Sequence, residues 1–297
     1  MSAWTVDRGC PASCATEPDP RVPLGELARR YATLTYALTR AVARGDRLAE
    51  PEVLRTEARA VLGALGVGVE RVGGMEGMQG LPSAEGVPFS VRADGVGTLV
   101  VANHISWLDV VALLAVEPVS VLAKREVGRW PVVGALARRA GTRFIDRDGS
   151  PRGLPCLVAG LADALRAGTS VLVFPQATTW CSVTGGRFRR AAFQAAVDAG
   201  APVRPVTVEY RQGGGPSTAA AFLGEEDFTA SLRRVAGARG LSVRVTASTP
   251  LWGTDRRVLA DAARRSVLGI GPSAAASCGP FAPSCREAAL ARKGPYR

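Results

Sequence analysis

One polar cluster combines residue types that can move a proton, and it interrupts the most apolar stretch of the chain. His104, the only histidine, follows the β-rich run 98–102, and Asp109 comes five residues later. Ser106 lies between them and is a candidate N-cap, so the next turn would bring the Asp109 carboxylate back to the imidazole. A carboxylate fixes one ring nitrogen as a donor and leaves the other as a proton acceptor. The pair predicts a general base, worth about 10²- to 10⁴-fold in rate, although a structural histidine has the same spacing.

The elements around this cluster alternate in type from residue 88 onward. Short β-rich runs are predicted as strands at 98–102, 119–123, 142–145, 170–174, 203–208 and 241–247. Helical stretches are predicted between them at 107–115, 130–139, 153–166, 188–198 and 254–266. Strands separated by helices favour an α/β fold with a mixed, mostly parallel sheet covered by helices. Pro205 weakens the fifth strand, because proline cannot donate to a sheet ladder.

Two helices are predicted before this region, as an N-terminal helical hairpin. Apolar residues recur at helical spacing between Pro23 and residue 44, and a second periodic stretch covers 50–65, followed by a glycine-rich connection at 66–87. The polar side of the first helix carries Arg29, Arg30, Arg40 and Arg44. That helix either packs on the core like any amphipathic helix or lies flat on an anionic bilayer.

The chain is predicted to hold one catalytic domain. Residues 1–22 and 269–297 lack periodicity and are rich in small residues and proline, which is typical of disordered tails. The domain between them covers 23–268, with a helical part at 23–66 and an α/β core at 88–268.

Charge and composition narrow the function classes. Lys and Arg total 37 against 26 Asp and Glu, a net charge of +11 that would favour anionic lipid headgroups or nucleic acid. The arginines are spread among apolar helices without a nucleic-acid motif, so nucleic acid is not expected as a partner. No apolar window is long enough to span a membrane and no secretory signal is visible, which predicts a cytoplasmic protein.

The cysteines are not expected to bind metal. Six of them are spread along the chain without a C-x-x-C pair, and one histidine cannot complete the usual zinc sets. An all-cysteine site stays open, but reduced thiols are the default in the cytoplasm.

Four blocks in order give the chain a specific resemblance. Asn103 to Asp109 matches an N-H-x-x-x-x-D block; the further blocks are Gly141 to Arg147, Phe174 to Thr179, and Ala201 to Val206. Lys124 and the turn from Pro131 to Gly134 also fit. Over about 90–268, the sequence resembles the 1-acylglycerol-3-phosphate acyltransferase family.

The resemblance implies an O-acyltransferase in which His104, oriented by Asp109, deprotonates an acceptor hydroxyl that attacks an acyl thioester directly. Lys124 and Arg147 would hold an anionic headgroup. Backbone amides around Ala177 and Thr178 would stabilise the oxyanion, with Gln176 in the same substrate-binding block. Acyl-CoA or acyl-carrier protein serves as co-substrate, and no further cofactor is implied. The expected partners are a lysolipid acceptor and the membrane surface, on the inner face of the plasma membrane.

The third block departs from the family's usual Phe-Pro-Glu-Gly-Thr-Arg. Gln176 replaces the acid, Ala177 the glycine and Thr179 the arginine. Glutamine keeps one carbonyl oxygen and a similar shape, whereas alanine restricts the backbone if φ is positive there. Loss of the arginine weakens the case for a phosphate, and family members that acylate lyso-ornithine lipid can also lack it. Phosphatidic acid formation from 1-acylglycerol-3-phosphate is the first expectation and lyso-ornithine lipid acylation the alternative.

Two other functions stay open. The altered third block would also fit a non-catalytic lipid-binding relative. A hydrolase with Ser106 as nucleophile is disfavoured, because no G-x-S-x-G elbow surrounds that serine.

Overall fold

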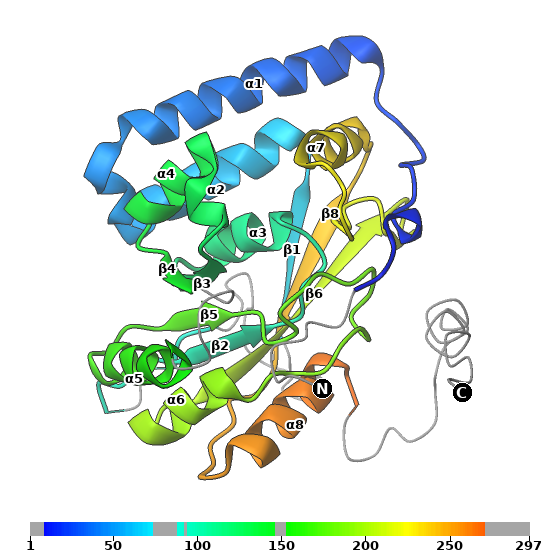
Figure 1. Ribbon diagram of the computed structural model, residues 1–297. Helices are drawn as coiled ribbons and strands as arrows, with labels where there is room; N and C mark the ends of the chain where they lie inside the picture. The colour runs from blue at the N-terminus through cyan, green and yellow to red at the C-terminus, as the bar shows by residue number, and fades with distance from the viewer. Residues whose placement is uncertain (1–8, 74–87, 92–93, 146–152, 271–297) are drawn as a thin grey trace, which may run out of the picture.

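The computed structural model describes residues 9–73, 88–91, 94–145 and 153–270, which are built around one sheet (Figure 1). Its strand order is β1-β8-β6-β2-β5-β3-β4, with β7 paired to β6. The strands are β1 (Gly68–Gly73), β2 (Leu99–Ala102), β3 (Ser120–Lys124), β4 (Arg143–Ile145), β5 (Val171–Val173), β6 (Val203–Gln212), β7 (Gly215–Pro216) and β8 (Ser242–Ala247). Among these, β6 pairs antiparallel with β7 and β8, and the other pairings are parallel. The mixed, mostly parallel sheet is confirmed.

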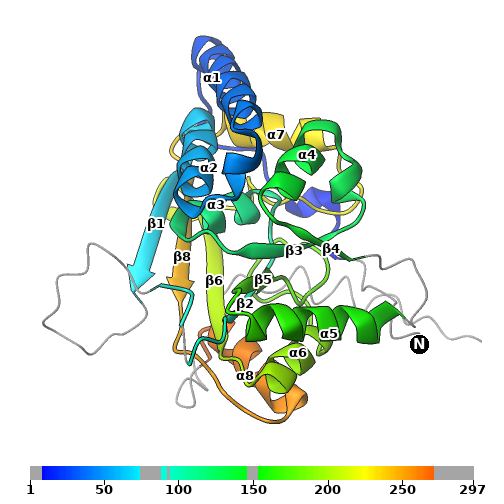
Figure 2. The same ribbon diagram turned by 90° about the vertical axis from the view of Figure 1, so that its left-hand side faces the viewer.

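Helices cover both faces of the sheet (Figure 2). One layer contains α1 (Leu24–Ala43), α2 (Pro51–Leu65), α3 (Leu108–Val116), α4 (Pro131–Arg139) and α7 (Phe228–Gly237). The other contains α5 (Gly153–Arg166), α6 (Ala191–Ala199) and α8 (Arg256–Val267). The described residues also form three 3₁₀ turns, η1 (Ala12–Cys14), η2 (Gly45–Ala49) and η3 (Val127–Arg129). Strand β2 contributes side chains to both faces of the sheet. Val100 and Ala102 belong to the hydrophobic core under the first helical layer, and Leu99 and Val101 belong to the core under the second. This alternation is the period of two that a strand imposes.

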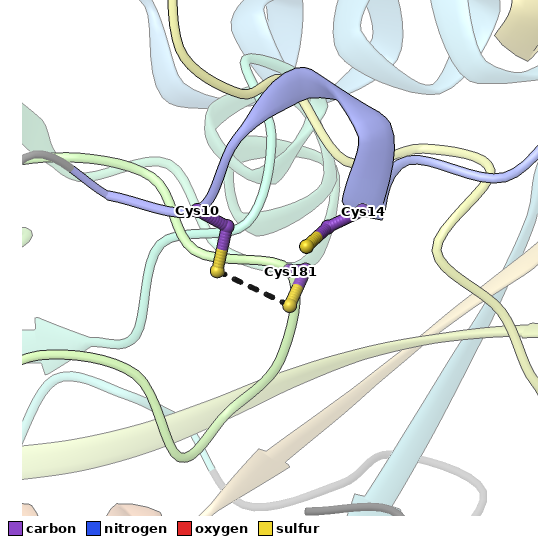
Figure 3. A group of neighbouring side chains, drawn as sticks. All are labelled: Cys10, Cys14 and Cys181. Carbon is purple, nitrogen blue, oxygen red and sulfur yellow. Dashed lines mark hydrogen bonds between the residues drawn. The ribbon is translucent and has the colours of Figure 1, made fainter. Parts of the chain in front are cut away.

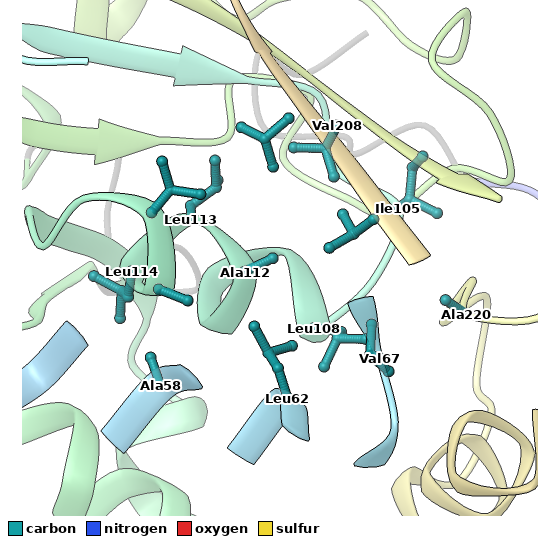
Figure 4. Packing of buried hydrophobic residues seen from close by; sticks show 14 of the residues in the cluster. Ala58, Leu62, Val67, Ile105, Leu108, Ala112, Leu113, Leu114, Val208 and Ala220 are labelled. Carbon is teal, nitrogen blue, oxygen red and sulfur yellow. The ribbon is translucent and has the colours of Figure 1, made fainter. Parts of the chain in front are cut away.

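Helix α3 lies in the middle of the first core (Figure 4). It packs between α2, which contributes Ala58 and Leu62, and the sheet face that carries Val208. Because Leu108, Leu113 and most other residues of α3 are buried, nearly every side of the helix is in contact with protein. Helix α3 begins one residue before Asp109, so this packing fixes the position of the acid.

The predicted helical hairpin is present, and the arginines of α1 are mostly used inside it. Arg40 of α1 and Arg44, the residue that follows α1, bind the carboxylate of Glu57 of α2 at 2.8 and 3.0 Å, and that carboxylate is nearly buried. Arg30 is buried and donates to the carbonyls of Leu65, Ala236 and Ala238. These contacts favour the interpretation of α1 as a helix packed on the core. Within the described residues, no helix is both long and apolar enough to cross a bilayer.

Strand β1 and helix α7 appear where no strand or helix was predicted. Strand β1 lies within the glycine-rich connection and pairs in parallel with β8, a partner about 170 residues away in sequence. Helix α7 begins after Asp227, whose side chain accepts from the amides of Thr229 and Ala230. Pro205 is tolerated inside β6 because its carbonyl bonds Ser248 while the β8 ladder starts only at Val206. The N–H that proline lacks would therefore point to a position beyond the end of the β6–β8 pairing, where no ladder hydrogen bond is lost.

Residues 9–22 differ from the disordered tail that was expected there. The Val22 amide donates to the Gly237 carbonyl at 2.9 Å, and the Arg239 amide donates to the Pro20 carbonyl at 3.0 Å. Thr16 bonds Thr218 through its amide at 3.1 Å. This N-terminal segment (residues 9–22) thus runs against the domain. Residues 271–297 of the second expected tail lie outside the described residues.

Candidate active site

The predicted site residues that the structure describes follow or end neighbouring strands at one edge of the sheet. Strands β2, β5 and β3 are neighbours and parallel, so their carboxyl ends meet at that edge. His104 follows β2, the run from Gln176 to Thr178 follows β5, and Lys124 ends β3 with an exposed side chain. In open α/β sheets, ligands bind outside the carboxyl ends of the strands. Arg147 lies outside the described residues.

The imidazole and the acid form the predicted pair. His104 Nδ1 lies 2.9 Å from Asp109 Oδ2, and the same oxygen accepts from the amides of Ile105 at 2.7 Å and Ser106 at 2.9 Å. The Asp109 side chain is fully buried, while 22% of the His104 side chain is exposed. A carboxylate can only accept, so Nδ1 carries the proton and Nε2 is left with its lone pair. One nitrogen of the partly exposed imidazole thus faces the protein, and the other keeps a lone pair that can take a proton.

Ser106 plays a smaller part than expected. The N-cap position of α3 is Trp107, one residue later, and Ser106 Oγ accepts from the Leu108 amide at 3.2 Å. Ser106 is also fully buried. A fully buried hydroxyl that is engaged by a backbone amide is poorly placed to attack a lipid, which argues against the hydrolase alternative.

Tyr210 is a member of the site that the sequence did not reveal. Its hydroxyl donates to Asp109 Oδ1 at 2.6 Å. Burial, together with the negative charge of Asp109, raises the pKa of Tyr210 well above its usual value, so the phenol remains a neutral donor. The Asp109 carboxylate thus accepts four hydrogen bonds and cannot turn away from His104. The predicted strand stopped at residue 208, whereas β6 continues with the same alternation through Tyr210.

The loop after β5 holds His104 from the other side. The Phe174 ring stacks on the imidazole at 4.1 Å between centroids and 21° between planes. The His104 amide donates to Gln176 Oε1 at 2.6 Å, and the His104 carbonyl accepts from the Trp180 amide at 2.8 Å. Ring and backbone of His104 are therefore both fixed by the third block.

Two departures in the third block have structural partners of their own. Gln176 accepts from His104 through its oxygen and donates to the Gly185 carbonyl through its nitrogen. A glutamate would make the first bond but has no proton for the second. The Thr179 hydroxyl donates to the Phe222 carbonyl, so it serves the packing of the loop at 217–224. Both replacements are therefore hydrogen-bonded within the protein.

The third departure stores backbone strain. Ala177 has a φ of +66°, in the left-handed region. The alanine at the family's glycine position was expected to restrict the backbone if φ were positive, and φ is positive. Its amide donates to the Phe174 carbonyl at 3.1 Å, which makes it a poor oxyanion donor and leaves the Thr178 amide as the remaining candidate.

Relief of this strain gives a testable prediction. Ala177→Gly should raise the free energy of unfolding by about 1 kcal/mol, because the left-handed conformation costs alanine roughly that much. Urea unfolding of both proteins measures the difference. The matched control is Ala199→Gly at the end of α6, where alanine is helical and glycine should destabilise by about 1 kcal/mol or less. A lower free energy of unfolding in Ala177→Gly than in wild type would contradict the proposed backbone strain at Ala177.

Comparison with known proteins finds one family of acyltransferases. The model of the Acyltransferase family matches residues 82–209. Lyso-ornithine lipid O-acyltransferase of Pseudomonas aeruginosa is 37% identical over 187 residues, covering 61% of this chain and 72% of that protein. 1-acyl-sn-glycerol-3-phosphate acyltransferase of Neisseria meningitidis serogroup B is 36% identical over 187 residues, covering 63% and 67%.

A solved structure supports the fold. The crystal structure of the 1-acyl-sn-glycerophosphate (LPA) acyltransferase PlsC from Thermotoga maritima aligns with a TM-score of 0.54 at 19% identity. The alignment covers 83% of this chain and 95% of that one. The family-model match includes His104, Asp109 and the third block. Together with the two relatives, of which this chain covers two thirds or more, it shows that the chain belongs to the 1-acylglycerol-3-phosphate acyltransferase family.

Proposed function

We propose that this acyltransferase moves a fatty acyl group from acyl-CoA or acyl-carrier protein to the hydroxyl of a lysolipid, with His104 as base and Asp109 as its positioning partner. The observation that carries the proposal is the partly exposed imidazole held against a fully buried carboxylate. Proton transfer by a positioned base is the step that an alcohol nucleophile needs.

Acyl transfer in this proposal proceeds by direct attack, without a covalent acyl-enzyme intermediate. His104 Nε2 takes the proton from the acceptor hydroxyl while its oxygen attacks the thioester carbonyl. The tetrahedral intermediate then collapses with cleavage of the carbon–sulfur bond. The departing thiolate takes the proton from the imidazolium, which restores the neutral base. Asp109 stabilises the imidazolium in between, and the Thr178 amide is the candidate donor to the oxyanion.

The first candidate acceptor is 1-acylglycerol-3-phosphate. Lys124 is exposed at the carboxyl edge, where an ammonium can meet a phosphate. The relative from Neisseria meningitidis bears this substrate in its name.

Lyso-ornithine lipid is the second candidate, favoured by one observation. Where the family has an arginine, Thr179 directs its hydroxyl to the Phe222 carbonyl and adds no positive charge. The Pseudomonas aeruginosa relative is named for this acceptor.

A panel of acceptors separates the two. Thiol release is measured from acyl-CoA and acyl-carrier protein with 1-acylglycerol-3-phosphate, lyso-ornithine lipid and neutral monoacylglycerol. If the phosphate is bound as proposed, Lys124→Ala should raise KM for 1-acylglycerol-3-phosphate by about 10-fold, the effect of losing one charge-assisted bond. Arg257→Ala on the exposed face of α8 is the matched control and should leave KM unchanged. Turnover of lyso-ornithine lipid alone would replace the first candidate by the second, and turnover of neither would overturn both.

We further propose that the protein works peripherally at the inner face of the plasma membrane, because its acceptor is an amphiphile and its net charge is +11. Val132 and Val133 of α4 are 46% and 37% exposed, and α4 lies beside α1, where Tyr36 is 68% exposed. These apolar side chains are the proposed contact with the lipid.

Liposome flotation tests this surface. Val132→Ser combined with Val133→Ser should reduce the fraction of protein bound to anionic vesicles several-fold. Val258→Ser is the control, since Val258 is 65% exposed on α8, in the opposite helical layer. Equal flotation of all three proteins would reject α4 as the membrane contact.

A further inference from the structure

Three cysteines that are far apart in the sequence meet in space. Cys10 and Cys14 belong to the N-terminal segment, and Cys181 lies in the loop after β5. Their sulfur atoms all lie within 4.8 Å of one another, and those of Cys10 and Cys181 are 3.2 Å apart. Figure 3 shows the three side chains pointing into one space between the two segments. Cys10 is buried and the other two are partly buried.

We propose that Cys10, Cys14 and Cys181 bind one zinc ion as thiolates. Zinc binds thiolate sulfur at about 2.3 Å with tetrahedral geometry, which sets the sulfurs roughly 3.8 Å apart. The observed group, with one pair at 3.2 Å and all pairs within 4.8 Å, brackets that value. The spacing of Cys10 and Cys14, with three residues between them, is typical of zinc-binding pairs. Sulfur ligands exclude magnesium and calcium, which prefer oxygen.

Zinc binding would change the charge of the three-cysteine group by one unit. Each thiol loses one proton to solvent as its sulfur binds, so three thiolates and one zinc ion leave a net charge of −1. The chain as a whole carries +11, which makes one added negative charge easy to accommodate. Zinc in proteins is usually four-coordinate, so one further ligand would complete the site.

The site would join the N-terminal segment to the loop that fixes His104. Cys181 directly follows Trp180, whose amide donates to the His104 carbonyl. The two segments already touch, because a Cβ atom on Gly9 would lie 2.5 Å from the Thr179 carbonyl oxygen. An ion at the three sulfurs would therefore hold the third block in place, as a structural site with no part in the chemical step.

Metal content tests the proposal on the full chain. Protein purified under reducing conditions is dialysed with zinc, and bound zinc is measured by elemental analysis. We expect about one ion per chain in the wild type, in Cys156→Ser, and in a triple variant with Cys156, Cys278 and Cys285 changed to serine. Cys10→Ser, Cys14→Ser and Cys181→Ser should each lower the zinc affinity by at least 10-fold.

Two readouts on the wild-type protein make the test independent of variants that fail to fold. Cobalt should give the intense visible bands of a tetrahedral site and thiolate-to-metal charge transfer in the near ultraviolet. Zinc should also protect the three cysteines, but not Cys156, from alkylation mapped by mass spectrometry. Neither readout depends on acyl transfer, so failure of the proposed function would not affect them. Zinc-independent alkylation, unchanged zinc binding in the cysteine variants, or a Cys10 to Cys181 disulfide in glutathione buffer of cytosolic potential would each overturn the proposal.

Discussion

His104→Ala is expected to lower kcat by about 10²- to 10⁴-fold, which is the usual contribution of a positioned general base. The acceptor hydroxyl would then have to lose its proton to water during attack. The affinity for lysolipid should change much less, because the imidazole is one partly exposed ring at the edge of the sheet. Initial rates of thiol release, together with lysolipid binding by calorimetry, measure the two quantities separately.

Ser106→Ala is the control within the same block. Its hydroxyl accepts from the Leu108 amide and also hydrogen-bonds Tyr210, so its loss should cost about 1–3 kcal/mol of stability and leave kcat within 10-fold of wild type. If Ser106→Ala abolished turnover as completely as His104→Ala, the role of His104 as sole base would be wrong and a serine nucleophile would return.

Asp109 should show the second largest effect, and its two simplest substitutions should behave differently. Asp109→Asn can keep its oxygen toward the Ile105 and Ser106 amides, which cannot accept an amide NH₂. That orientation points the NH₂ group at the Tyr210 hydroxyl, which can accept as well as donate. The His104 tautomer survives, but the charge that stabilises the imidazolium is lost. A bond to a charged group contributes about 1.5–3 kcal/mol, so kcat should fall by about 10- to 100-fold.

Asp109→Ala should instead prevent stable folding. It leaves the Tyr210 hydroxyl and two backbone amides buried without their acceptor, at about 1–3 kcal/mol each. The sum is comparable with the whole stability of a typical domain, about 5–15 kcal/mol. Urea unfolding and kcat of both variants check the pair of predictions. A well-folded Asp109→Ala protein, or an Asp109→Asn protein with wild-type kcat, would contradict the role derived for the carboxylate.

The pairing of His104 with Asp109 could be predicted from the sequence because its geometry is local. His104 and Asp109 are five residues apart, and a strand end followed by a helical turn is enough to join them. Tyr210 could not be found in this way, since it reaches Asp109 only through the pairing of β6 beside β2 and a strand longer than its apolar run. The contact of Gln176 with Gly185 depends likewise on the course of a loop.

Periodicity predicted most helices well but not what their polar faces do. The arginines of α1 formed a pattern compatible with a bilayer surface, yet three of the four pair with Glu57 or with buried carbonyl groups. Strand β1 was missed because its six residues include glycine at both ends and its partner strand is distant in sequence. The N-terminal segment lacks any periodic pattern of apolar residues. Its order comes from backbone hydrogen bonds to the folded domain and from the burial of Cys10 against that domain, and neither contact is visible in the sequence.

A single-turnover experiment with labelled acyl thioester tests the catalytic proposal most directly. Enzyme in excess over acyl-CoA is mixed with saturating lysolipid, and free thiol, acylated lipid and acylated protein are followed over time in wild type and His104→Ala. For wild type we predict that thiol and acylated lipid appear at the same rate without labelled protein, and for His104→Ala that both substrates bind while product formation slows by at least 10²-fold. Acylated protein that forms before the lipid product, or equal rates in the two proteins, would contradict direct attack by a hydroxyl that His104 activates.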